Sequence, residues 1–285
     1  MYDTVIIGGG PAGLQAALTL GRVHRTAVLF DSGEYRNDAT AHAHNVLTLD
    51  GVAPGELRRR GREELAAYDS IEVRGDEVTS VRREGDGFAV TPASGSMVTA
   101  RTVILATGLA DTLPDIPGLA AQWGDRVAHC PFCHGHEFAG RPVAVMDAPS
   151  HATMTAAKLR PIASDVRILA PGDLARVEET PDGLRLHLAD GTDLQVAGLF
   201  AAPRTAQRAP FAAALGLALT EFGVVATDGL GRTSVDGVWA VGDMAQSSAW
   251  PAPLTSIVLS MSTGQLAAFD IVQGLAVAEL SRDAG

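Results

Sequence analysis

A glycine-rich turn near the N-terminus limits the folds open to this chain. Gly8-Gly9-Gly10-Pro11-Ala12-Gly13 fits the pattern G-x-G-x-x-G. It stands between an apolar, β-branched run at 4–7, which favours a buried strand, and a helix-forming stretch at 14–20. A second apolar run at 26–30 ends at Asp31. This order predicts a βαβ unit that binds a dinucleotide.

Three glycines of the turn have distinct predicted tasks. Gly8 permits a tight turn, Gly10 lets backbone N–H groups approach a pyrophosphate, and Gly13 lets the helix pack on the sheet. The helix N-terminus then binds the anion. Asp31 lies 18 residues beyond Gly13, where a carboxylate can accept a hydrogen bond from a ribose hydroxyl. The turn alone does not distinguish one dinucleotide from another, and a glycine-rich loop without a ligand is the less favoured alternative.

The rest of the chain predicts an α/β fold with two nucleotide-domain-like units. Short apolar runs stand beside Gly or Pro and helix-like stretches at 102–106, 142–146, 166–169 and 237–241. Residues 142–169 repeat the strand, turn, helix, strand order of the N-terminus. Turn-forming residues at 114–118 and 227–232 mark the expected joints. We therefore expect one domain at 1–113 and 232–285, with the second, at 114–231, inserted in it.

Composition excludes several classes of function. The 285 residues are 46% hydrophobic and 19% charged, as in an ordinary soluble globular protein. The net charge is −11, and the arginines at 58, 59, 60 and 62 alternate with acids as one predicted solvated helix face, so no nucleic-acid partner is expected. No apolar run reaches the roughly 18 residues of a membrane helix, and no leader is apparent. These features predict a cytoplasmic protein.

The only two cysteines form a C-x-x-C pair, Cys130-Pro131-Phe132-Cys133, flanked by His129 and His134. Two cysteines at this spacing can close a small disulfide ring, and a helix N-terminus would favour the thiolate that thiol exchange requires. In a reducing compartment such a pair is more often catalytic or metal-binding than structural. Zinc binding is the weaker reading, because every ligand would come from one turn and no distant Cys/His cluster completes the site.

Three further segments are typical of one family. Ala106-Thr107-Gly108 and Val241-Gly242-Asp243 each close a predicted strand, and Ser262–Ala268 is a predicted helix. With the glycine turn and the cysteine pair, these segments resemble the thioredoxin reductase family over nearly the whole chain. The resemblance implies two Rossmann-like domains and bound FAD. It implies cofactor contacts from Gly8, Gly10, Pro11, Ala12, Gly13, Asp31, Ser32, Asn45, Ala106, Thr107, Gly108, Gly242, Asp243, Ser256 and Ile257.

The resemblance also assigns roles around the cysteines. It implies that Cys133 exchanges electrons with the flavin and that Cys130 meets the substrate. Thioredoxin reductases carry an acidic residue after the second cysteine, whereas this chain has His134, a group suited to removing thiol protons near neutral pH. The pattern C-x-x-C-H-G-x-E resembles the flavoenzymes that close disulfides in natural products of the gliotoxin and holomycin type. His134 and His129 are then candidate bases, and His136 is a weaker one.

The second unit departs from an NADPH-dependent reductase. After its first strand the chain reads Asp147-Ala148-Pro149-Ser150-His151-Ala152, where glycines would admit a phosphate. After its next strand Arg176 is the nearest cation. We therefore expect FAD-dependent oxidation of a small-molecule dithiol, with O₂ as acceptor and H₂O₂ as product, in natural-product biosynthesis or self-protection. The alternatives are a disulfide reductase supplied by NADPH or a protein donor, and a flavin sensor. A homodimer is expected by analogy alone.

Overall fold

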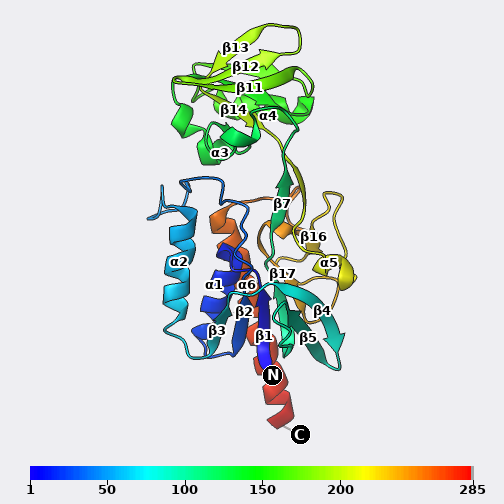
Figure 1. The fold of residues 1–285 in the computed structure, drawn as a ribbon. Helices are drawn as coiled ribbons and strands as arrows, with labels where there is room; N and C mark the ends of the chain where they lie inside the picture. Colours follow the sequence, from blue (N-terminus) through cyan, green and yellow to red (C-terminus); the bar gives the residue numbers. More distant parts are fainter. Residues whose placement is uncertain (284–285) are drawn as a thin grey trace. The chain divides into compact units, whose positions relative to one another are not determined.

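The protein folds into two compact units, seen in the computed structural model of residues 1–283 (Figure 1). Unit 1 contains Met1–Arg36, Gly55–Ala110 and Ala206–Gly285, and unit 2 contains Asn37–Pro54 and Asp111–Thr205. Each unit has a parallel sheet in which a helix connects neighbouring strands. The predicted α/β fold is confirmed.

The main sheet of unit 1 has the order β3-β2-β1-β6-β5-β4, with β17 pairing with the second half of β6. The pairs β3/β2, β2/β1, β1/β6 and β6/β17 are parallel, and β4, β5 and β6 pair antiparallel. The strands are β1 (Tyr2–Ile7), β2 (Ala27–Phe30), β3 (Ile71–Arg74), β4 (Val78–Glu84), β5 (Gly87–Pro92), β6 (Val98–Leu105) and β17 (Val238–Ala240).

The helices of unit 1 cover this sheet. α1 and α6 pack on the sheet through Ala16, Leu20, Ala267 and Ile271, which share a buried core with strand residues such as Ile6. The α-helices are α1 (Pro11–Gly21), α2 (Pro54–Leu65), α5 (Phe211–Ala214) and α6 (Ile257–Asp283). The remaining elements are β16 (Val225–Thr227), the 3₁₀ turn η3 (Gly242–Met244) and β18 (Ala245–Ser247).

Unit 2 repeats the βαβ arrangement. Its parallel sheet has the order β10-β9-β14-β8, and α4 connects β9 to β10. A second, antiparallel sheet has the order β11-β12-β13. The α-helices are α3 (Pro131–His134) and α4 (Pro149–Leu159), and the 3₁₀ turns are η1 (Ala120–Gln122) and η2 (His136–Phe138). The strands are β8 (Val127–Ala128), β9 (Pro142–Met146), β10 (Asp165–Leu169), β11 (Leu174–Thr180), β12 (Gly183–Leu188), β13 (Asp193–Val196) and β14 (Gly198–Ala201).

The chain leaves unit 1 through β7 (Leu109–Thr112) and returns through β15 (Arg204–Gln207), and these two strands pair with each other. The return therefore comes at Ala206 and not at the expected residue 232. Phe211 and Val225 belong to the core of unit 1, and β16 pairs with β18. The turn residues at 227–232 mark a loop inside unit 1, because local turn chemistry cannot reveal which core a segment joins.

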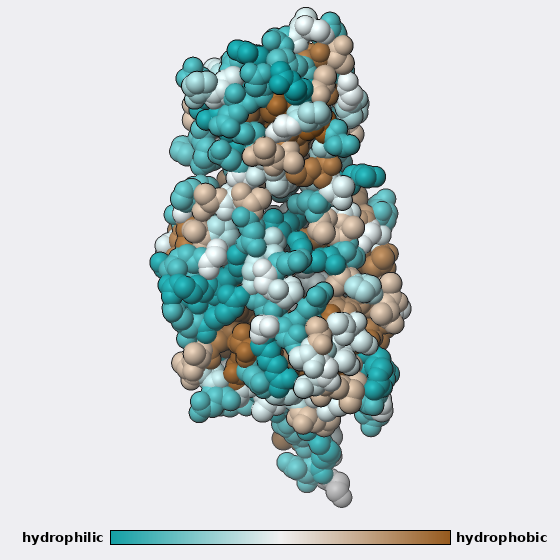
Figure 2. All heavy atoms as spheres, in the orientation of Figure 1, coloured by the Kyte–Doolittle hydropathy of each residue, from teal (hydrophilic) through white to brown (hydrophobic). Residues whose placement is uncertain are grey.

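The arginine-rich helix α2 corrects another expectation. Arg59 and Arg60 pair with Glu56 on the outer face, over which Figure 2 shows a hydrophilic surface. Arg58, however, is only 5% exposed, and its guanidinium lies 3.6 Å from the centroid of the Tyr35 ring. The four arginines therefore do not form one solvated face. Among residues 1–283, no helix is both long and apolar enough to cross a membrane.

Candidate functional site

The glycine turn has the geometry of a dinucleotide loop. Gly8 has a φ of +117°, and a Cβ there would lie 2.3 Å from the Ala106 carbonyl oxygen. At Gly13 a Cβ would lie 1.9 Å from the Gly8 carbonyl oxygen, so α1 begins directly against the strand. Around Gly10, by contrast, a Cβ would meet no atom within 4 Å. Two glycines thus allow close packing, and Gly10 leaves open space at the helix N-terminus.

Asp31 ends β2 beside this loop and is 5% exposed. Its Oδ1 accepts the Gly33 N–H at 3.1 Å, and its Oδ2 accepts the Tyr35 hydroxyl at 2.5 Å and an Arg62 N–H. These contacts use three of the about four lone-pair positions of a carboxylate, which leaves capacity for one ribose hydroxyl. Ser32 follows Asp31 and is exposed. The roles of Tyr35 and Arg62 were not foreseen, because nothing local ties either to Asp31.

The other candidate cofactor residues of unit 1 surround the carboxyl ends of β6 and β17. Thr107 Oγ1 donates to the Met244 sulfur at 3.2 Å, and Ala106 is buried. Asp243 accepts from Arg36 at 3.0 Å and from the Ser260 hydroxyl at 3.4 Å. The Gly242 N–H donates to Thr263 Oγ1 at 3.0 Å, which ties η3 to α6.

The N-terminus of α6 begins with a capping serine. Ser256 Oγ accepts the Leu259 N–H at 3.1 Å, and Ile257 opens the 27-residue helix. A helix of this length presents a full positive dipole end. This is the property that the sequence assigned to Ser256 and Ile257.

Asn45 lies elsewhere, in the 37–54 segment of unit 2. Its φ is +62°, and its N–H donates to Asp50 Oδ1 at 2.6 Å. That hydrogen bond, with a further contribution from His44, holds the pKa of Asp50 below its usual value. The other candidate cofactor residues lie in unit 1.

The cysteine pair of unit 2 is a disulfide. Cys130 and Cys133 are bonded, with their Cα atoms 5.3 Å apart, and both are partly exposed. Cys130 is the N-cap of α3, and its carbonyl oxygen accepts the N–H groups of Cys133 and His134. α3 has only four residues, so the helix dipole expected to favour a thiolate is short.

His134 has one ring nitrogen held by the 37–54 and 111–205 segments of unit 2. Its Nε2 lies 3.2 Å from the Gly124 carbonyl oxygen and 3.4 Å from Thr40 Oγ1. A carbonyl oxygen only accepts hydrogen bonds, so this contact assigns the proton to Nε2. In the neutral ring Nδ1 is then the nitrogen that can accept a proton.

The other two histidines have different surroundings. His129 is exposed, and its ring stacks on Trp123 at a centroid distance of 5.8 Å. His136 begins η2 and is exposed. Its neighbour Glu137 has an Oε1 3.4 Å from His44 Nε2. Within residues 1–283, no group of three or more His, Cys, Asp or Glu side chains is arranged to hold a metal ion.

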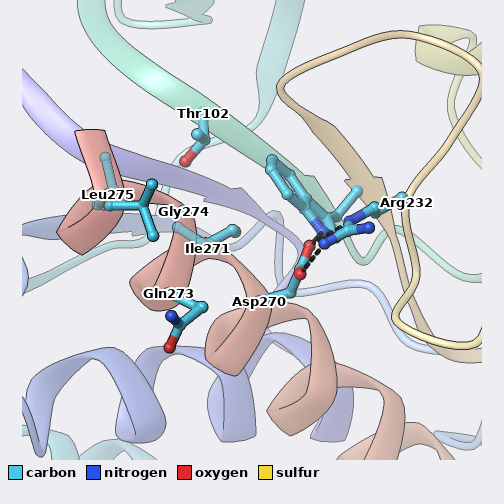
Figure 3. Close-up of a pocket in the computed structure, with 9 residues that line it drawn as sticks. Thr102, Arg232, Asp270, Ile271, Gln273, Gly274 and Leu275 are labelled. Atoms are coloured by element: carbon cyan, nitrogen blue, oxygen red, sulfur yellow. Dashed lines mark hydrogen bonds and ion pairs between the residues drawn. The ribbon is translucent and has the colours of Figure 1, made fainter. Parts of the chain in front are cut away.

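A pocket of about 410 Å³ elsewhere in unit 1 shares no residue with the candidate cofactor set (Figure 3). At its edge, Asp270 Oδ2 accepts from Arg232 Nε at 2.6 Å and from Trp239 Nε1 at 3.0 Å. These bonds join α6 to β17 and to the loop before it. They give this pocket a structural role in holding α6.

The fold and the disulfide define a class of enzyme. Residues 2–174 and 162–264 match the family described as pyridine nucleotide-disulphide oxidoreductase, and the chain belongs to this family. It is an oxidoreductase, and members of the family and their thioredoxin reductase relatives are FAD-binding flavoproteins. The protein is accordingly a flavoprotein, and the open space at Gly10 in front of α1 fits the pyrophosphate of FAD.

Particular relatives narrow the likeness. Thioredoxin reductase aclD of Aspergillus oryzae is 34% identical over 317 residues, covering 99% of both chains. A probable thioredoxin reductase of Arthroderma benhamiae is 38% identical over 184 residues, which span 62% of this chain and 46% of that protein. The crystal structure of HlmI superposes with a TM-score of 0.89 at 36% identity, covering 99% of this chain and 96% of that one.

Gly10→Ala should weaken FAD binding without weakening the fold. The added Cβ meets no protein atom within 4 Å but enters the space through which the pyrophosphate approaches the N–H groups of α1. We expect the dissociation constant for FAD, measured by flavin fluorescence on the apoprotein, to rise at least about 10-fold. The free energy of unfolding of the apoprotein should stay within about 0.5 kcal/mol. Gly75→Ala, at another site with open space, is the control. Unchanged FAD affinity in Gly10→Ala would remove the loop from the cofactor site.

Tyr35 should make stability depend on alkaline pH. Burial raises the pKa of Tyr35 from 10.0 to about 12, and the hydrogen bond to Asp31 adds to this rise. Between these values the unfolded chain loses the phenol proton before the folded chain does, so the free energy of unfolding falls as pH rises. Tyr35→Phe should therefore show a shallower fall than the wild type in urea titrations at pH 9 and pH 11. An equally steep fall would contradict the assignment.

Proposed function

We propose that this enzyme oxidises a small-molecule dithiol to a disulfide through Cys130 and Cys133, with FAD as cofactor and O₂ as electron acceptor. The observation that carries the proposal is the turn between β9 and α4 in unit 2. This is the position at which a βαβ unit of this fold offers glycines and N–H groups to a dinucleotide phosphate. In this chain the turn offers a carboxylate and a proline.

The carboxylate belongs to Asp147, whose Oδ1 accepts the Ala148 N–H at 2.6 Å. Pro149 is the first residue of α4 and has no N–H. One donor of the helix start is therefore occupied and another is missing, while the negative charge of Asp147 would repel a phosphate. These features disfavour NADPH at α4.

The end of β10 has the same character. The Ala170 N–H donates to Asp173 Oδ2 at 2.7 Å. Arg176, the cation expected nearest to a 2′-phosphate, donates to Glu178 at 2.8 Å and contacts His187 at 2.7 Å. A reductase needs both phosphate contacts for NADPH, and here a carboxylate stands at each position.

The chain's own residues support the thiol chemistry in two exchange steps. A substrate thiolate attacks Sγ of Cys130, which breaks the protein disulfide and leaves Cys133 as a thiolate. The second substrate thiol then attacks the substrate sulfur of the mixed disulfide, and the product disulfide leaves while Cys130 is released. His134 is positioned to accept a thiol proton at Nδ1, and His129 is the alternative base. Two electrons and two protons pass from the substrate to the cysteine pair.

Bound FAD supplies the two-electron acceptor that returns the cysteine pair to the disulfide, and O₂ takes these electrons with H₂O₂ as product. The residues proposed to hold FAD are those of the glycine loop, Asp31, 106–108, Asp243 and the start of α6. We further propose a cytoplasmic homodimer that acts in natural-product biosynthesis or self-protection.

A second candidate function follows from the names of the relatives. Several are thioredoxin reductases, which favours a disulfide reductase supplied with electrons by NADPH or by a protein donor. In that case electrons would enter the cysteine pair from the flavin side. The two functions differ in which compound reduces the enzyme.

Anaerobic mixing of the purified yellow protein separates these functions. Dithiothreitol and NADPH are added to separate samples, and the absorbance of the oxidised flavin is followed. The proposal predicts rapid bleaching by the dithiol, little bleaching by NADPH, and recovery of the colour in air with H₂O₂ formed. Rapid bleaching by NADPH would establish the reductase and overturn the interpretation of the β9–α4 turn.

A further inference from the structure

The residue between the two cysteines is an exposed aromatic ring. Phe132 is 69% exposed, the most exposed of the phenylalanines in the described chain. Isolated exposed apolar residues are common and need no explanation. Phe132 is different because it lies inside the ring that the Cys130–Cys133 disulfide closes. Whatever bonds to Cys130 must therefore approach this ring.

The ring is held on one side by α4. Lys158 Nζ lies 5.7 Å from the centroid of Phe132, within the range of a cation–π contact. α3 also packs on the end of α4, since a Cβ at Gly135 would lie 3.1 Å from Ile162 and 3.4 Å from Leu159. The ring therefore has a preferred position and still exposes most of its surface.

A second apolar side chain stands on the same face of α4. Met154 is 58% exposed and precedes Lys158 by one helical turn, so the two side chains are neighbours. Methionine adapts well to the shape of an apolar ligand. We call Phe132, Met154 and Lys158 the Phe132 platform.

We propose that the Phe132 platform binds the body of the substrate and selects dithiols with a flat, apolar or aromatic body over small aliphatic ones. This inference rests on the proposed function. Consecutive Cα atoms are about 3.8 Å apart, so a molecule bonded to Cys130 lies within a few ångströms of Phe132. An aromatic body there can stack on the ring with centroids about 4.5–7 Å apart. A dithiol without such a body gains nothing from the platform.

The test compares 1,2-benzenedimethanethiol with dithiothreitol on the holoenzyme. The measured quantity is the second-order rate constant for anaerobic bleaching of the flavin by each dithiol. Phe132→Ala should lower the constant for the aromatic dithiol about 10-fold and leave that for dithiothreitol within about twofold. Lys158→Met, which keeps the chain length but removes the charge, should lower it to a smaller extent. Ile168→Ala, at an exposed apolar residue on β10, is the control and should change neither constant.

The outcomes separate this inference from the proposed function. Equal loss for both dithiols in Phe132→Ala would mean that the ring serves the cysteine geometry, and no loss for either would mean that it binds nothing; both results overturn the platform. O₂ uptake by the wild type with dithiothreitol tests the oxidase function separately. If uptake is absent, the ratio of the two anaerobic constants still decides the platform, because thiols can reduce the disulfide whichever acceptor the enzyme uses.

Discussion

Cys133→Ser and Cys130→Ser should each lower kcat for dithiol oxidation at least about a thousandfold, an effect of the size seen when a catalytic nucleophile is removed. The reason is that neither variant can form the Cys130–Cys133 disulfide that accepts the substrate electrons. The measurement is O₂ consumption with dithiothreitol under saturating FAD. A variant that keeps a tenth of the wild-type rate would show that the disulfide is not on the route.

The same two variants separate the roles of the cysteines. If Cys130 meets the substrate, the lone Cys130 thiolate of Cys133→Ser should attack an aromatic disulfide reagent faster than the lone Cys133 of Cys130→Ser. We expect a difference of about 10-fold, since exchange rates follow access to the attacking sulfur. The reverse order would exchange the roles assigned to the two residues.

Gly264→Ala should lower the free energy of unfolding of the apoprotein by about 2–3 kcal/mol, as overpacking does in a buried contact. A Cβ at Gly264 would lie 2.1 Å from the Ala12 carbonyl oxygen, so α6 and α1 must move apart. Because α1 carries the glycine loop, the same variant should retain less FAD after purification. Urea unfolding and the ratio of flavin to protein measure the two effects.

Gly274→Ala is the matched control on the same helix. A Cβ at Gly274 meets no atom within 4 Å, and alanine is the better helix former, so this variant should gain up to about 1 kcal/mol. If Gly264→Ala proves as stable as Gly274→Ala, the close contact of α1 with α6 does not exist in solution.

Local patterns predicted much of this fold. Gly8 and Gly13 need glycine for reasons that act within a few residues, and their strand–turn–helix context is found between β1 and α1. The disulfide was predicted in the same way, because Cys130 and Cys133 lie within one turn. A helix-interior glycine such as Gly264 signals a close approach, and this signal could have predicted the contact of α6 with Ala12.

Contacts between distant segments were not predictable. Arg58 was expected on a solvated face, and its burial against Tyr35 depends on how α2 packs beside the end of β2. The inclusion of 37–54 in unit 2 follows from contacts such as that of Thr40 with His134, 94 residues apart in the chain. The return to unit 1 at Ala206 has the same origin, since it depends on which core Phe211 joins.

The most direct test of the central claim is the stoichiometry of turnover in air without NADPH. The enzyme is mixed with a known amount of dithiothreitol, and the disulfide formed, the O₂ consumed and the H₂O₂ produced are measured together. Oxidation of a dithiol by the cysteine pair, with O₂ as acceptor, predicts equal amounts of all three over many turnovers. Formation of no more than one disulfide per enzyme, together with NADPH-dependent reduction of a disulfide, would contradict the oxidase and establish a reductase.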